Sequence, residues 1–368
     1  MAKPRAFIHP DSQSGVFHVI SRIVDRRMVL GEAEKEAFVG MMRAFEALHQ
    51  VQVLTFCIMS NHFHILVRVP ERPAGFAPDT ATVQQLWAAA VGKEWHATVS
   101  GQHDIYRGNG SEAAIEAWRE AIVARMFSLS EFMKALKQRF TQWYNRRAGR
   151  RGTLWESRYT SVIVEDAERA LRTMATYIDL NPVRAGMVSD PADYRWCGYA
   201  EAMTGNAKAR AGLQRIVWCL RTGEQIESAV IQPPVAALSP AAAKAAAKRA
   251  TLRALILYRN FLGLQGRPRT REIADGTVQT VRRGLSEKVQ ARLAGTGGVR
   301  VEVLRRRVRH LTAGVILGSR EFIEQWFRAH RGWFGGKSSA QRQTGARSTG
   351  QRELRGLYTV RALKGPLS

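Results

Sequence analysis

The pattern of apolar and polar positions from residue 15 on predicts a strand, a helix and then a hairpin. Gly15–Arg22 alternates and is rich in β-branched residues, as strands are. Glu32–His49 places apolar residues at helical spacing, which predicts an amphipathic helix. Val51–Met59 and His62–Val69 are strand-like runs separated by a Ser-Asn turn pair, so we expect them to form a hairpin.

A second helix and a fourth strand complete this pattern. Ser128–Asn145 begins with a capping-box sequence, because Glu131 follows Ser128 at a distance of three residues. Arg158–Glu165 (RYTSVIVE) favours a strand. The order β-α-β-β-α-β is that of the ferredoxin-like unit, an antiparallel sheet with two helices on one face. The pattern therefore predicts an α+β fold.

Two further segments belong to the same half of the chain. Asp166–Asn181 predicts a helix that ends at Pro182, because proline is poorly tolerated in a helix interior. Residues 70–127 are too many for an ordinary connection. We therefore expect an insertion there, with helices over 82–90 and 112–125.

Positive charge is concentrated in the second half of the chain. The 368 residues carry a net charge of +25, and residues 206–368 alone hold 31 Lys and Arg against 9 Asp and Glu. Such an excess draws a protein to polyanions, and to nucleic acid first. We expect a folded domain over 1–205 and a basic, mainly α-helical DNA-contacting region over 206–368, joined near 231–248 and ending in a mobile tail over 335–368.

Cysteine usage and hydropathy restrict the compartment. The three cysteines, Cys57, Cys197 and Cys219, are too few for a disulfide framework and lack zinc-knuckle spacing. No run approaches the about 18–20 apolar residues that span a membrane, and the first residues lead into no apolar signal region. We expect a cytoplasmic, nucleoid-associated protein with no membrane partner.

Two histidines stand two residues apart in the second strand of the hairpin. Strand periodicity places the side chains of His62 and His64 on one face of the sheet. Two imidazoles that converge in this way form two corners of a divalent-ion site. The alternative is a pair of half-exposed histidines without a ligand, and this pattern alone does not decide between the two.

A tyrosine and an asparagine share one face of the helix that follows the fourth strand. Tyr177 and Asn181 are four residues apart, so their side chains are neighbours on a helix. An amide oxygen beside a phenol can complete a site for a hard metal ion. The alternative is that Tyr177 is a half-buried packing residue and Asn181 a helix stop before Pro182.

Together these motifs resemble a known family. Ser-Asn-His-Phe-His resembles the HUH motif (His, hydrophobic, His) of single-tyrosine transposases. Tyr-x-x-x-Asn-Pro-Val-Arg-Ala-Gly, beginning at Tyr177, is similar to the catalytic helix of their REP-associated tyrosine transposase branch. The resemblance covers about residues 5–205 and includes Arg150–Arg158 (RRGTLWESR) and Asp193–Trp196.

The resemblance implies metal-dependent cleavage and rejoining of single-stranded DNA. It makes His62, His64 and Asn181 the metal ligands and Tyr177 the nucleophile, which would leave a 5′-phosphotyrosine and a free 3′-hydroxyl. Mg2+ or Mn2+ is favoured over Zn2+, because two imidazoles and one amide leave positions open for phosphate oxygens. The implied partner is single-stranded or hairpin DNA, bound by a monomer or a homodimer.

Several cations are candidates for DNA contact: Arg150, Arg151, Arg158, Arg305, Arg306 and Arg307. The last three form a run on an expected helix, where a solvated helix face is an equal alternative. We also consider a helix-turn-helix within Arg269–Leu293. Two rival functions stay open: a domesticated DNA-binding protein that no longer cleaves, and a metal phosphodiesterase that uses water while Tyr177 only positions substrate.

Overall fold

The structure, a computed structural model, describes residues 14–217, 240–265, 269–272, 278–282, 284–294, 309–312, 315–330, 347–348 and 356–360. These residues fall into two compact units. As far as they are described, residues up to Val53, Ile58–Phe63 and Val67–Ile163 form the first unit, and Leu54–Cys57, His64–Leu66 and the residues from Val164 on form the second. The predicted domain boundary at residue 205 stays a prediction.

The first unit contains the elements that the apolar pattern predicts. They are β1 (Gly15–Arg22), the short 3-10 turn η1 (Val24–Arg26), α1 (Glu32–Leu48), β2 (Gln52–Ile58), β3 (His62–Val69), α5 (Leu129–Arg147) and β4 (Thr160–Val164). The central residues of β2 and β3 and the last residue of β4 are counted in the second unit. The strands are neighbours in the order β2-β3-β1-β4. This order is that of the ferredoxin-like fold, so the predicted fold class is confirmed.

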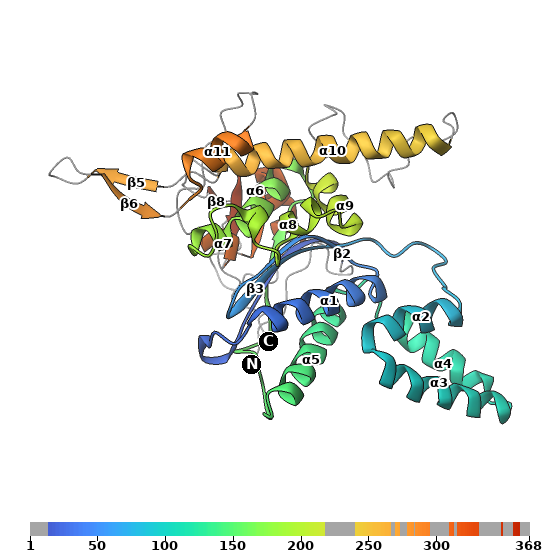
Figure 1. Ribbon diagram of the computed structural model, residues 1–368. Coiled ribbons are helices and arrows are strands. Elements are labelled where there is room, and N and C mark those ends of the chain that lie inside the picture. The colour runs from blue at the N-terminus through green and yellow to red at the C-terminus, as the bar shows by residue number, and fades with distance from the viewer. Residues whose placement is uncertain are drawn as a thin grey trace, which may run out of the picture. The chain divides into compact units, whose positions relative to one another are not determined.

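Helices α1 and α5 pack together and bury aromatic side chains (Figure 1). The ring of Phe38 lies 4.9 Å from that of Phe63 and 5.1 Å from that of Phe140, between centroids. Ser128 caps α5, because its side chain accepts a hydrogen bond from the Glu131 N–H at 3.3 Å. The Ser128 cap expected from the sequence therefore marks the start of α5.

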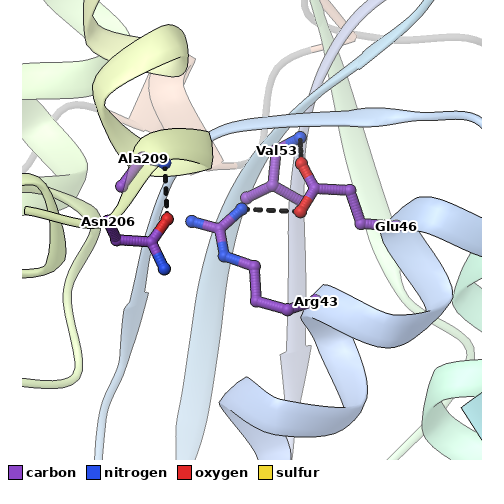
Figure 2. Close-up of polar contacts among 5 residues, drawn as sticks. All are labelled: Arg43, Glu46, Val53, Asn206 and Ala209. Carbon is purple, nitrogen blue, oxygen red and sulfur yellow. Dashed lines mark hydrogen bonds and ion pairs between the residues drawn. The ribbon is translucent and has the colours of Figure 1, made fainter. Parts of the chain in front are cut away.

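A buried carboxylate ties α1 to β2 within the first unit. Glu46 accepts hydrogen bonds from the Arg43 guanidinium and from the Val53 N–H, each at 2.7 Å (Figure 2).

Within the second unit, the Asn206 side chain accepts a hydrogen bond from the Ala209 N–H at 3.0 Å and caps α9 (Ala207–Val217). Each contact satisfies backbone or charged groups that burial would otherwise leave unpaired.

The insertion over 70–127 is helical, as expected, and has one helix more than the sequence predicted. Its helices are α2 (Thr80–Val91), α3 (Lys93–Gly108) and α4 (Glu112–Val123). The rings of Trp87 and Trp118 lie 5.9 Å apart, and the Gln84 amide contacts the His103 imidazole at 2.6 Å. Helix α3 (KEWHATVSGQHDIYRG) escaped prediction because it contains few large apolar residues.

Five short elements begin the second unit: α6 (Glu168–Asp179), α7 (Asn181–Arg184), the 3-10 turn η2 (Pro191–Asp193), α8 (Gly198–Met203) and α9. Two glycines bring α8 and α9 against the backbone of β2. A Cβ atom on Gly212 would lie 2.3 Å from the Leu54 carbonyl oxygen, and one on Gly198 would lie 2.3 Å from the Thr55 hydroxyl. Only glycine permits this approach.

The described residues after α9 form α10 (Pro240–Gln265), β5 (Arg269–Glu272), β6 (Val278–Arg282), α11 (Glu287–Ala294), α12 (Arg309–Thr312), β7 (Ile316–Gly318), α13 (Arg320–Ala329), β8 (Arg347–Ser348) and β9 (Tyr358–Val360). Strands β5 and β6 form an antiparallel hairpin. The helix-turn-helix considered over Arg269–Leu293 is therefore wrong. The Asp275-Gly276 pair between two runs with β-branched residues is a hairpin signal, and it prevails over helix propensity.

Strands also occupy part of the predicted tail. β9 pairs antiparallel with β7, with Leu317 opposite Thr359, and β8 pairs with β9. Leu357 and Thr359 are buried. The expectation of a mobile tail over 335–368 does not hold for these residues, because their apolar and β-branched side chains add to the sheet. None of the helices in the described part of the chain has the length and apolar character to cross a membrane.

Candidate active site

His62 and His64 lie on β3, whose bounds the sequence predicted correctly. The side chains of both residues project from the same face of the strand. His64 is buried, with 3% of its surface exposed, whereas His62 is half-buried and its Nδ1 lies 2.6 Å from the Asn61 side-chain oxygen. The contact to Asn61 fixes the orientation of one imidazole, as an outer hydrogen bond does for metal-ligating histidines.

Tyr177 lies on α6 with its ring against His64. The two ring centroids are 5.8 Å apart and the ring planes are nearly perpendicular, at 89°. Tyr177 is 6% exposed. The sequence-predicted nucleophile and one predicted metal ligand are therefore in contact, although 113 positions separate them along the chain.

Arg184 is a further residue at Tyr177, and sequence reasoning missed it. Its guanidinium carbon lies 5.2 Å from the centroid of the Tyr177 ring, and its Nη1 donates to the Tyr177 carbonyl at 3.0 Å. The available signal was its place in the Asn-Pro-Val-Arg segment that begins at Asn181. This contact puts a permanent positive charge beside the phenol ring.

The helix that carries Tyr177 ends earlier than predicted. α6 stops at Asp179, and Asn181 is the first residue of α7, whose first turn accommodates Pro182. The prediction of one helix ending at Asn181 is thus corrected: proline is well tolerated in the first turn of a helix and here it begins one. Leu180 between them keeps helical backbone angles, so Tyr177 and Asn181 still stand one turn apart.

The Asn181 side chain offers a polar group that the protein itself does not use. Its amide nitrogen is buried and has no hydrogen-bond partner. Turning the amide by 180° about its last bond exchanges nitrogen for oxygen at that position. No group of three or more His, Cys, Asp or Glu side chains in the described ranges is arranged to hold a metal ion.

Asp179 is a buried carboxyl group that the sequence analysis did not single out. It accepts hydrogen bonds from the Thr55 hydroxyl at 2.7 Å, from the Tyr199 N–H at 3.3 Å and from the Tyr258 hydroxyl. Complete burial raises the pKa of Asp179 from 3.8 to about 7, and the three donors oppose this rise. An acidic residue between the apolar residues Ile178 and Leu180 was the signal in the sequence.

Three of the arginines proposed for DNA contact lie after α5. Arg151 and Arg158 are exposed, and Arg150 places its guanidinium carbon 5.9 Å from the centroid of the Tyr144 ring. Arg147 stands in the same way over Trp143, at 5.8 Å. Arginines that alternate with half-exposed aromatic rings are typical of surfaces that bind single-stranded nucleic acid. Arg305, Arg306 and Arg307 lie outside the described residues.

One segment of the chain matches a known family. Residues 12–74 match the family described as "Transposase IS200 like", which confirms the transposase resemblance over the segment that contains β1, α1, β2 and β3. No curated protein is similar to the chain. A solved structure described as a REP-associated tyrosine transposase bound to a REP hairpin shares 13% identity with a TM-score of 0.34, over 56% of this chain and 87% of that one. A TM-score of this size does not support the transfer of individual residues.

Proposed function

We propose that this chain, whose residues 12–74 match the IS200-like transposases, cleaves and rejoins single-stranded DNA through Tyr177. The observation that carries the proposal is the contact between Tyr177 and His64, at 5.8 Å between ring centroids. It joins a potential nucleophile to the His-x-His strand of the family segment. A packing tyrosine alone would not require a histidine partner.

The three residues that the sequence suggests as metal ligands suit a divalent cation in their chemistry. His62 and His64 supply two imidazoles on one strand face. Asn181, whose amide nitrogen is buried without a partner, supplies a third ligand when the amide is turned to present its oxygen. We propose that these three residues hold Mg2+ or Mn2+. When bound, such an ion polarises phosphate oxygens and offsets their charge.

The proposed reaction is a transesterification by the phenol oxygen. Tyr177 attacks the scissile phosphorus, the bond from phosphorus to the 3′ oxygen breaks, and the products are a 5′-phosphotyrosine and a free 3′-hydroxyl. The proton of the phenol is lost as the new bond forms, and the 3′ oxygen gains one. Arg184 supports the step, because a guanidinium beside the ring favours negative charge on its oxygen.

We propose that two groups of basic residues hold the DNA. The first, the α5-end cluster, consists of Trp143, Tyr144, Arg147, Arg150 and Arg151 and offers both stacking surfaces and positive charge. The second lies on α10, where Lys248, Arg249 and Arg253 are exposed. Arg158 and the run Arg305–Arg307 remain proposed contacts. The proposed substrate is a single strand, or a hairpin with single-stranded flanks.

The experiment that tests this function uses the full chain with end-labelled hairpin DNA and either Mg2+ or Mn2+. We expect a protein–DNA adduct that survives a denaturing gel and that mass spectrometry assigns to Tyr177. Nicked DNA without an adduct would replace the proposal with hydrolysis by water. Binding without nicking on every hairpin tried would replace it with a DNA-binding protein that has lost catalysis.

A further inference from the structure

A cluster of buried polar groups joins the helix that carries Tyr177 to three other elements of the second unit. The carboxylate of Asp179 on α6 accepts from Thr55 on β2 and from Tyr258 on α10. The N–H of Tyr199 on α8 donates to the same carboxylate. All four residues are buried, and the aspartate and Tyr258 are 0% exposed.

The geometry of α6 makes this cluster relevant to Tyr177. Residues two apart on an α-helix lie about 200° apart around its axis. Asp179 and Tyr177 therefore project from nearly opposite sides of α6. One side of the helix is held by hydrogen bonds to Asp179, and the other presents Tyr177 to His64. A rotation or shift of α6 would break the first set of contacts and displace the second.

The partners of Asp179 are themselves held in place. Gly198 allows α8 to approach the backbone of Thr55 so closely that a Cβ atom on it would lie 2.9 Å from the Thr55 Cα. Helix α10 makes a second contact with α6, where the Arg172 guanidinium carbon lies 3.7 Å from the centroid of the Phe261 ring. It also contacts α9, where Gln214 donates to the Thr251 hydroxyl at 2.6 Å. Figure 1 shows α10 running past α6 and α9.

We propose that Asp179, held by Thr55 and Tyr258, is a positioning residue that fixes α6 so that Tyr177 faces His64. This inference rests on the proposed function of Tyr177. It also gives α10 a role beyond its exposed charge, because α10 carries Tyr258, whose hydroxyl donates to the Asp179 Oδ2. Part of the basic half of the chain is then needed for strand cleavage as well as for holding DNA.

Substitution of Tyr258 by phenylalanine provides the sharpest test. Tyr258→Phe keeps the ring and removes one donor, so Asp179 loses a hydrogen bond without a large change in packing. We expect the rate of adduct formation at saturating DNA to fall about tenfold while the Kd for DNA changes by less than about twofold. Asp179→Asn keeps an acceptor for Thr55 and Tyr199 and can donate to the Tyr258 oxygen, so we expect at least about a third of the wild-type rate.

The matched control is Ile323→Val, which removes one methylene from a fully buried site on α13. This variant lowers the packing density of the same unit without changing the Asp179 cluster. We expect it to form the adduct at the wild-type rate. Equal losses of rate in Tyr258→Phe and Ile323→Val would mean that the cluster acts only on stability and would overturn the positioning role. A wild-type rate in Tyr258→Phe would do the same.

A second measurement separates this inference from the proposed function. The ring current of Tyr177 acts on the protons of His64, so nuclear magnetic resonance of the histidine side chains reports their contact; the His64 signal is assigned from its absence in His64→Gln. We expect this signal to shift in Tyr258→Phe and to stay unchanged in Ile323→Val. If wild-type protein forms no adduct but the His64 signal shifts, the function fails and the positioning role stands. An unshifted His64 signal contradicts the positioning role in either case.

Discussion

The imidazole of His64 and the phenol ring of Tyr177 meet edge to face, with their centroids 5.8 Å apart. One ring belongs to a strand of the predicted hairpin and the other to a helix that follows the last strand of the ferredoxin-like order. Their contact assembles a candidate site from two motifs that are weak separately. The contact also indicates which substitutions should affect cleavage.

Loss of the phenol oxygen should abolish covalent chemistry. Tyr177→Phe keeps the ring against His64 and Arg184, so we expect normal folding and DNA binding with no adduct and no nick. The check is a denaturing gel followed by mass spectrometry of the wild-type adduct. Tyr106→Phe, on α3 in the insertion, is the matched control and should cleave normally. An adduct that maps to Tyr144 or Tyr159 would assign the nucleophile to that residue.

Removal of either imidazole should remove metal binding and cleavage together. We expect His62→Ala and His64→Ala to lose adduct formation while DNA affinity changes by less than about threefold, because phosphate contacts dominate affinity. Mn2+ binding without DNA, followed by electron paramagnetic resonance, gives a readout that does not depend on cleavage. His96→Ala, in the insertion, is the control. Undiminished Mn2+ binding by the His64→Ala protein would exclude this site.

The exposed cations of α10 should contribute to the salt dependence of DNA binding. Replacing Lys248, Arg249 and Arg253 together by glutamine should reduce the slope of log K against log salt by up to about 2, at about 0.7 for each phosphate that the protein no longer neutralises. Truncation after residue 205 is a poorer test, because it also removes Tyr258 from Asp179.

The control for the α10 variant neutralises exposed cations that already have acidic neighbours. Arg107 lies 2.9 Å from Asp104, and Lys134 lies 3.6 Å from Glu131. Arg107→Gln with Lys134→Gln should leave the slope unchanged. An identical slope in the α10 variant and in wild-type protein would show that these cations belong to ordinary surface.

Two glycines should respond to alanine in opposite directions. Gly212→Ala should lower the free energy of unfolding by about 1–3 kcal/mol, because its Cβ would collide with the Leu54 carbonyl oxygen. Gly40 lies within α1 and has nothing within 4 Å of its Cβ position, so Gly40→Ala should raise that energy by up to about 1 kcal/mol. Denaturant unfolding measures both changes. A tolerated Gly212→Ala would contradict the close packing of α9 on β2.

Acid should destabilise the first unit through His49. Burial lowers the pKa of His49 below 6.5, and the Arg125 charge adds to this, while the hydrogen bond to the Arg125 carbonyl and the charge of Glu131 oppose it. The unfolded chain therefore binds a proton at a higher pH than the folded protein does. Stability from this group is complete above pH 6.5 and declines below it, by at most about 1.4 kcal/mol per pH unit.

The check compares thermal unfolding of wild-type protein and His49→Asn at about pH 7.5 and about pH 5.5. Asparagine can keep the hydrogen bond to the Arg125 carbonyl but does not titrate. We expect the wild-type midpoint to fall more on acidification than that of the variant. Equal falls would show that His49 does not govern this pH range.

The ferredoxin-like order was readable from the sequence because periodicity is a local property. β1 and β3 begin and end where the alternation of apolar residues does, and the start of α5 follows from Ser128. The same locality explains the His62 and His64 pair and the spacing of Tyr177 and Asn181. These motifs also carried the transposase resemblance, which the family match confirms over residues 12–74.

Tertiary structure alone decided the contacts between distant segments. Thr55 and Asp179 are 124 positions apart, and Asp179 and Tyr258 are 79 apart, and no local pattern pairs them. The pairing of β9 with β7 likewise turned part of an expected tail into a strand. A periodic pattern states which side of an element is buried. Which groups meet there depends on the packing of elements far apart in the chain, and this packing is what brings Tyr177 to His64.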